Sequence, residues 1–168
     1  MESHAVYIRP WQKQDAQGLA TAANNRNVWM NVRDRFPHPY TVMDALQWIQ
    51  LREPQKPTEN FCICYEGKVA GGIGVMLKDD VYRKSIEIGY FVGEEYWGRG
   101  IATRAVGLLL QHIEQNFDAV RIYAEVFERN KASMKVLRNN GFYLEGIRKK
   151  AVFKAGVVMD DYVWVKML

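Results

Sequence analysis

Two glycines one residue apart, Gly98 and Gly100, enclose Arg99 between an apolar run and a long segment with helical periodicity. The first N–H groups of a helix lack partners within the helix, and the helix dipole adds positive potential at that end. Glycine lets an anion reach the backbone without meeting a Cβ atom. Arg99 and Arg104 add positive charge for the same anion. The pattern predicts a phosphate-binding turn, and a plain turn into a surface helix is the alternative.

Regular elements must hold this turn in place. Residues 85–92 alternate, which places Ile86, Ile88, Tyr90 and Val92 on one face of a strand. Apolar residues then recur at helical spacing, which predicts a helix over 100–116. The remaining patterns predict strands at 5–9, 60–65, 69–77, 119–127, 142–154 and 157–167, and helices at 12–30, 41–51 and 130–140, the first of which becomes irregular near Asn25-Arg26-Asn27. This order predicts a mixed α/β fold around one twisted sheet.

The composition excludes several classes of protein. At 168 residues the chain is long enough for one domain with a core, and its net charge of +4 gives no strong expectation of a nucleic-acid partner. No apolar stretch has the length of a membrane span and the N-terminus lacks a signal-peptide pattern, so a cytoplasmic protein without a membrane partner is expected. Cys62 and Cys64 are expected to be reduced and buried on one strand face, and no metal site is predicted.

Three phosphate-binding motifs can be compared with the glycine turn. The P-loop requires Lys and Ser or Thr where Arg99 and Gly100 stand, and the dinucleotide fingerprint requires a third glycine in place of Thr103. The stretch 97–102 instead resembles the pyrophosphate loop of the GNAT family of N-acetyltransferases, whose pattern is Gln/Arg-x-x-Gly-x-Gly/Ala. Gly100 and Ala102 match the last two fixed positions, whereas Trp97 departs from the first.

The resemblance extends over nearly the whole chain. The stretches 35–49, 87–92, 128–142 and 144–150 look like the RimJ/RimL-type branch of that family, in the same order. This implies a single N-acetyltransferase domain over residues 1–168 with the α/β GNAT fold. The implied architecture is a mixed twisted sheet of about seven strands with four or so helices, splayed between the fourth and fifth strands.

The resemblance also implies where acetyl-CoA binds. The pantetheine arm would pair with the backbone at Tyr90, Phe91 and Val92, as a ligand completes an exposed strand edge. The pyrophosphate would rest on the loop at the helix start, with Asn130 and Ser133 beside the pantetheine. A plain helix cap is the alternative for Asn130. The loop positions concerned are Trp97, Gly98, Arg99, Gly100, Ile101, Ala102 and Thr103.

Acetyl transfer to an amine needs a proton acceptor, because only the neutral amine attacks a thioester. Glu87 is the lone charge in its strand and is the candidate base, with a structural carboxylate paired to an arginine as the alternative. By resemblance, the N–H of Val92 would stabilise the developing oxyanion. Ser133 would protonate the leaving thiolate, or simply contact the cofactor sulfur.

Two positions depart from the family pattern. Leu137 stands where many members carry a tyrosine acid, and Val152 stands where some members of the branch carry a glutamate base. The resemblance implies an amine acceptor, with a protein N-terminal α-amine favoured over a small amine such as a polyamine or aminoglycoside. A non-catalytic acyl-CoA sensor is a further alternative. The sequence leaves open whether the chain is a monomer or a homodimer.

Several other residues have side chains that could take part in catalysis or binding, but the sequence shows no partner for them. Asp160 is interpreted as structural, and the three histidines form no catalytic set. The acceptor pocket is expected to lie between segment 24–41 and the final hairpin. For three aromatic residues there are two alternatives: they line this pocket, or they belong to the core. The histidines are His4, His38 and His112, and the aromatic residues are Trp29, Tyr40 and Trp48.

Overall fold

The computed structural model describes residues 5–52 and 55–168 and contains one seven-stranded sheet with the strand order β1-β2-β3-β4-β5-β7-β6. Neighbouring strands run antiparallel except β4 and β5, which are parallel. This is the mixed α/β GNAT architecture that the sequence predicted. The strands are β1 (Val6–Pro10), β2 (Asn60–Tyr65), β3 (Lys68–Leu77), β4 (Ser85–Val92), β5 (Arg121–Phe127), β6 (Tyr143–Lys154) and β7 (Val157–Met167).

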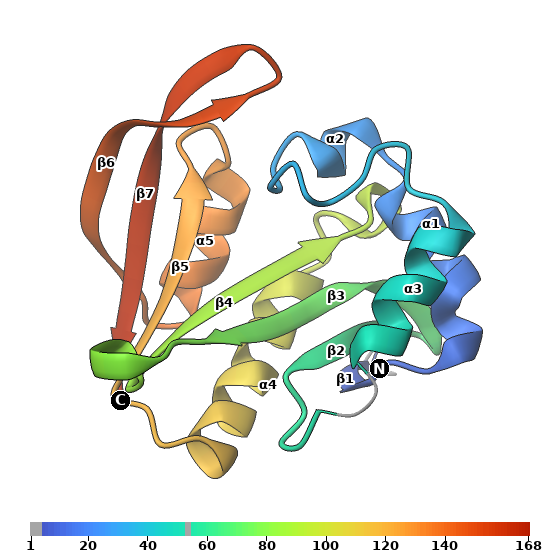
Figure 1. Ribbon diagram of the computed structural model, residues 1–168, viewed down its shortest axis with the longest axis horizontal. Coiled ribbons are helices and arrows are strands. Elements are labelled where there is room, and N and C mark those ends of the chain that lie inside the picture. The colour runs from blue at the N-terminus through green and yellow to red at the C-terminus, as the bar shows by residue number, and fades with distance from the viewer. Residues whose placement is uncertain (1–4, 53–54) are drawn as a thin grey trace.

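Helices cover both faces of the sheet (Figure 1). The main core lies under α4 and α5, and the second core lies under α1 and α3 and contains the reduced Cys62 and Cys64. The described part of the chain holds five α-helices, at the upper end of the expected number. They are α1 (Ala16–Ala23), α2 (Arg26–Trp29), α3 (Val42–Arg52), α4 (Ile101–Asn116) and α5 (Lys131–Asn139), with short 3-10 turns at Lys13–Asp15, Asp80–Tyr82 and Glu94–Tyr96.

The expected helix over 12–30 is divided into α1 and α2, and the chain breaks next to the place where the sequence predicted an irregularity. Asn24 leaves the helical region, with φ −77° and ψ 70°. The side chain of Asn25 then accepts a hydrogen bond from the N–H of Val28 at 3.0 Å and caps a new helix. The break turns the chain toward the end of β4, where α2 lies (Figure 1).

The sheet opens between β4 and β5, as the sequence predicted. These strands pair only from Ser85 to Glu87, opposite Arg121 to Tyr123. Beyond that point β4 continues to Val92 beside β3 while β5 diverges, and Figure 1 shows the gap between their upper ends. The second half of β4 therefore has a neighbour on one side only.

The hydrogen-bond pattern of β4 leaves main-chain groups facing this gap. Gly93 N–H donates to the carbonyl of Ala70 at 2.8 Å, one step beyond the paired residues Val92 and Gly71. Because hydrogen-bonded and non-hydrogen-bonded pairs alternate along an antiparallel ladder, the peptide groups of Val92 and Tyr90 point away from β3. Their N–H groups and the Tyr90 carbonyl are available to a ligand that enters the gap, whereas the Val92 carbonyl accepts a hydrogen bond from Trp97.

Candidate active site

The loop before α4 has the conformation that its glycines predict. Gly98 and Gly100 have φ of 74° and 73°, a left-handed conformation that other residues adopt only with strain. A Cβ atom built at either position would meet no atom within 4 Å, so the space beside the loop is open. Gly100 is the N-cap of α4, and the free N–H groups of the first helical turn follow it directly. The loop therefore has the backbone conformation and the open space that an anion at the start of a helix requires.

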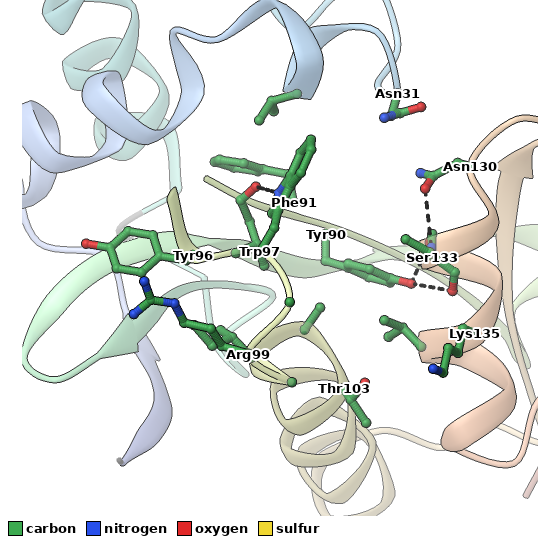
Figure 2. Close-up of a pocket in the computed structure, with 18 of the residues that line it drawn as sticks. Asn31, Tyr90, Phe91, Tyr96, Trp97, Arg99, Thr103, Asn130, Ser133 and Lys135 are labelled. Atoms are coloured by element: carbon green, nitrogen blue, oxygen red, sulfur yellow. Dashed lines mark hydrogen bonds between the residues drawn. The ribbon is translucent and has the colours of Figure 1, made fainter. Parts of the chain in front are cut away.

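A cleft with a volume of about 540 Å³ runs from this loop into the gap between β4 and α5 (Figure 2). Every residue that the sequence assigned to the cofactor lines it. Sequence reasoning missed several other lining residues because they come from α2, from the loop that follows it and from the far side of α5. They include Val28, Asn31, Val32, Lys135, Val136 and Asn139.

Trp97 has a defined role at the position where the family pattern has Gln or Arg. Its indole N–H donates a hydrogen bond of 2.7 Å to the carbonyl oxygen of Val92, which ties the loop to the end of β4. The guanidinium of Arg99 lies 5.9 Å from the centre of the Tyr65 ring, on the outer side of the loop. Trp97 therefore fixes the loop against the end of β4.

Asn130 and Ser133 meet at the start of α5. The Asn130 side chain accepts a hydrogen bond of 3.2 Å from the N–H of Ser133, so it caps the helix. The Ser133 hydroxyl lies 2.7 Å from the Tyr90 hydroxyl, which reaches it from β4 (Figure 2). Burial raises the pKa of Tyr90 to about 12, although the hydrogen bond with Ser133 acts in the opposite direction.

A second and wider cleft of about 960 Å³ lies on the other side of the gap. It is bounded by the segment after α2, by the exposed face of β4 and β5 and by the β6–β7 hairpin. The two clefts share six described lining residues, which mark the place where contents of one cleft can meet contents of the other. These shared residues are Asn31, Val32, Tyr90, Phe91, Asn130 and Ser133.

Glu87 lies in the second cleft and is buried, with 4% of its surface exposed. One carboxylate oxygen accepts a hydrogen bond of 2.6 Å from Arg33, and the other accepts one of 2.8 Å from Lys78. The carboxylate is thus paired, as the structural alternative expected. Glu87 and Val92 are five positions apart, roughly 16 Å along a strand, so any proton transfer between Glu87 and an amine near Val92 requires water.

The ion pairs continue across the face of the sheet. Arg33 also contacts Glu125 at 3.1 Å, and Arg148 of β6 joins Glu125 to Asp161. Asp161 is buried, and one of its oxygens has no hydrogen-bond partner in the described structure. Burial, followed by the nearby charge of Glu125, raises the pKa of Asp161. The second cleft therefore has a row of carboxylates on β4, β5 and β7 with arginines above it.

Lys154 joins the final hairpin to the segment after α2. The residue is 2% exposed, and its ammonium lies 3.7 Å from the centre of the Trp29 ring and 2.8 Å from Asp34. Asp34 follows Arg33, so this contact holds in place the segment that carries Arg33. Arg129 adds a second connection by donating to the carbonyl of Met30.

The remaining predicted residues have structural surroundings. Asp160 accepts from the N–H of Lys150 at 2.9 Å and from Lys149 at 3.2 Å, in agreement with its structural interpretation. Leu137 is fully buried in the main core, and Val152 lies at the edge of the second cleft. Of the three aromatic residues, Tyr40 and Trp48 line this cleft and pack into the second core, whereas Trp29 contacts Lys154.

The histidines and the possible metal ligands were the remaining candidates for chemistry. His38 stacks on Trp29 and His112 lies 2.8 Å from the Thr58 carbonyl, whereas His4 lies outside the described residues. Within residues 5–52 and 55–168, no group of three or more His, Cys, Asp or Glu is arranged to hold a metal. No helix in that part of the chain is long and apolar enough to cross a membrane.

The family model for the acetyltransferase (GNAT) domain matches residues 5–143. The chain belongs to the GNAT family. It is therefore an N-acetyltransferase, and its splayed sheet and glycine loop are those of a GNAT enzyme. The residues present fit acetyl-CoA, because open left-handed glycines and outward main-chain groups line one continuous cleft.

Similar GNAT proteins act on different acceptors. A probable N-acetyltransferase, YjcK of Bacillus subtilis, is 29% identical and covers 97% of this chain and 94% of its own length. The spermidine N(1)-acetyltransferase of Escherichia coli is 26% identical over 86% of this chain and 76% of its own. The ribosomal-protein-serine acetyltransferase of Escherichia coli is 37% identical over 64% of this chain and 60% of its own.

Solved structures show the same GNAT fold. The ribosomal L7/L12 alpha-N-protein acetyltransferase RimL in complex with coenzyme A superposes with a TM-score of 0.84. The match covers 99% of this chain and 96% of that chain at 20% identity. At this identity the likeness shows the fold, and the roles of individual residues rest on the geometry above.

Proposed function

We propose that this GNAT enzyme transfers acetyl from acetyl-CoA to a primary amine, with the N-terminal α-amine of a protein as the leading acceptor. Acetyl-CoA supplies the activated acetyl group as a thioester. The observation that carries the proposal is the meeting of the two clefts at Tyr90 and Ser133, between a phosphate-type loop and an open acceptor side. A ligand held by the loop would extend along the free edge of β4 and end at this junction. We call the cleft beside the loop the cofactor cleft and the second cleft the acceptor cleft.

The proposed roles at the junction follow from the groups that face it. The loop amides from Gly98 to Thr103 bind the pyrophosphate, and the main-chain groups of Tyr90 pair with the pantetheine arm. The Val92 N–H stabilises the negative charge that develops on the acetyl oxygen. Ser133 donates to the leaving sulfur, and Asn130 holds the first turn of α5 beside it.

Glu87 is the proposed proton acceptor, and it acts through water. Its carboxylate lies on the acceptor side, 2.6 Å from Arg33 and 2.8 Å from Lys78. The distance along β4 places it away from the reacting nitrogen, which fits a relay rather than direct contact. Both interpretations of Glu87 then hold together, because a paired carboxylate can also receive a proton.

A protein N-terminus is the leading acceptor for two reasons. The ribosomal-protein-serine acetyltransferase is the most identical of the relatives described above, at 37%. The acceptor cleft is wide, and its walls are the segment after α2 and the final hairpin, which gives room for an extended polypeptide end. On this basis we assign the chain to the RimJ/RimL-type branch as part of the proposal.

A polyamine is the second candidate acceptor. The carboxylates of Glu87, Glu125 and Asp161 lie on three strands of one face. The arginines above them, Arg33 and Arg148, are 44% and 51% exposed, whereas Glu87 and Asp161 are buried. A ligand with several ammonium groups could reach these pairs from the cleft and replace the arginines as partners of the buried carboxylates. The spermidine N(1)-acetyltransferase relative supports this alternative.

The test is release of CoA thiol with a panel of acceptors at equal concentration. The panel contains a peptide with a free N-terminal serine, the same peptide with a blocked N-terminus, spermidine and an aminoglycoside. We expect the free peptide to give the highest kcat/KM and its blocked form to give none. Preference for spermidine would select the second candidate. Binding of acetyl-CoA without turnover on any amine would contradict both and favour an acyl-CoA sensor.

A further inference from the structure

Tyr90 supplies a phenol to a helix that lacks the expected one. The position on α5 where many GNAT enzymes carry a tyrosine is Leu137, which is fully buried in the core and faces away from the cleft lining. The Tyr90 side chain instead crosses from β4 to the first turn of α5 (Figure 2). Its oxygen lies 2.7 Å from Ser133 Oγ and 3.3 Å from the Ser133 carbonyl oxygen.

The contact lies at the meeting point of the two clefts. Tyr90 and Ser133 both line the cofactor cleft and the acceptor cleft. The Ser133 N–H already donates to the side chain of Asn130, which fixes the first turn of α5. The hydroxyl hydrogen of Ser133 can still rotate. The hydrogen-bond partner of that hydroxyl therefore determines whether its hydrogen can point into the junction of the two clefts.

The phenol of Tyr90 can be the donor in this contact. Burial raises the pKa of Tyr90 to about 12, which keeps the phenol protonated at neutral pH. Its one hydrogen can go to Ser133 Oγ at 2.7 Å, where either hydroxyl can donate, or to the Ser133 carbonyl oxygen at 3.3 Å. When Tyr90 donates to Ser133 Oγ, the shorter of the two contacts, the Ser133 hydrogen is available to the junction.

We propose that Tyr90 is a positioning residue that aims the Ser133 hydroxyl at the sulfur of acetyl-CoA. The inference rests on the proposed transfer to an amine. In that transfer the C–N bond forms, the C–S bond breaks and its electron pair stays on sulfur. Ser133 gives its proton to the sulfur and receives the proton of the phenol. The proton that the amine loses restores the phenol through water, so the amine loses one proton and the sulfur gains one.

A double-mutant cycle in the intact protein tests the coupling. Ser133→Ala should lower kcat about 100-fold, at the lower end for a positioned proton donor, and Tyr90→Phe about 10-fold, the effect of one lost hydrogen bond. The double variant should lose no more than Ser133→Ala alone, because residues that act as one unit are not additive. The Kd of the Tyr90→Phe variant for acetyl-CoA should equal that of the wild type, because phenylalanine keeps the ring that packs against the core. Losses that multiply, or full kcat in Tyr90→Phe, would overturn the proposal.

Tyr162→Phe is the matched control. Tyr162 of β7 also packs against the main core and is not among the described residues that line either cleft. The substitution removes the same oxygen atom from a tyrosine near α5, where Lys131 lies over its ring at 5.1 Å. We expect its kcat to equal that of the wild type, and thermal unfolding should show that all variants fold.

A second measurement needs no acceptor. The pKa of the thiol of bound CoA can be followed by NMR with 13C at the carbon next to sulfur. A donor to the thiolate stabilises it, so Ser133→Ala and Tyr90→Phe should each raise that pKa by about 1 unit. An unchanged value in both variants would overturn the role of Tyr90 even if the amine panel succeeds. A shift without any amine turnover would support Tyr90 while contradicting the proposed function.

Discussion

The two clefts of this protein are built on different principles. The cofactor cleft takes its main features from one continuous stretch, Tyr90 to Thr103, and offers mostly main-chain groups. The acceptor cleft takes its charges from residues far apart in the sequence, such as Arg33, Glu125 and Asp161. The first depends on backbone geometry, and the second on side chains held by ion pairs.

This difference shows why one cleft can stay constant while the other varies. Main-chain amides and left-handed glycines bind a diphosphate whatever the neighbouring side chains are, provided that the loop keeps its conformation. A row of ion pairs changes its charge with a single substitution, because buried charges depend on their partners. The relatives fit this contrast, since their names include a spermidine enzyme and a ribosomal-protein enzyme.

The contrast is tested most strongly at Gly100. Gly100→Asp places a carboxylate in the open space beside the loop, where the diphosphate is expected. The repulsion of like charges should raise the Kd for acetyl-CoA about 100-fold or more, as measured by calorimetry. The control is Gly156→Asp, which has a similar φ of 80° but lies in the final hairpin turn. Equal affinity in the two variants would contradict the role of the loop.

Glu87 tests whether the acceptor cleft contributes chemistry as well as charge. Glu87→Gln should lower kcat about 100-fold, because the proton acceptor is lost. Glu125→Gln removes the same charge from the same partner, Arg33, and should keep kcat. If the two variants behave alike, Glu87 has only an electrostatic role.

Lys154 tests whether the clefts can be changed separately. Lys154→Met keeps the stem on Trp29 but loses the bond to Asp34, whose side chain is 74% exposed and stays solvated. The segment that carries Arg33 should loosen, which we expect to raise the acceptor KM about 10-fold and leave the acetyl-CoA Kd unchanged. Lys149→Met, an exposed change on the same hairpin, should alter neither value. A rise in the acetyl-CoA Kd in Lys154→Met would show that the clefts are coupled.

Asp161 gives the smallest effect. Its folded-state pKa is raised, so the folded protein binds the proton more tightly, and stability falls as pH rises from the unfolded to the folded pKa. Asp161→Asn should therefore raise the melting temperature at pH 7 by roughly 2 °C, and the gain should vanish below the unfolded pKa of about 4. A lower melting temperature at pH 7 would show that the bond to Arg148 outweighs the cost of burial.

The sequence predicted the cofactor side better than the acceptor side for a physical reason. The alternation in β4, the glycine turn and the periodicity of α4 are local patterns, so the strand, the loop and the helix followed from neighbouring residues. The gap beside β4 came from the family resemblance. The break at Asn24 lies next to the irregularity that the sequence predicted, because the capping side chain of Asn25 competes with helix continuation at short range.

The acceptor side depends on distant contacts. Arg33 meets Glu87 across 54 positions, and Lys154 meets Asp34 across 120. No spacing rule in one sequence links residues that are so far apart. The sequence could therefore predict that Glu87 pairs with an arginine, but not which arginine. Asp161 was missed beside Asp160, because only the register of β7 shows which of the two carboxylates faces the cleft.

The most direct test is a crystal structure of the protein with CoA. We expect the diphosphate oxygens within about 3 Å of the main-chain nitrogens from Gly98 to Thr103, with the sulfur beside Ser133. A diphosphate bound elsewhere, or a loop closed by its own side chains, would contradict the assignment of both clefts.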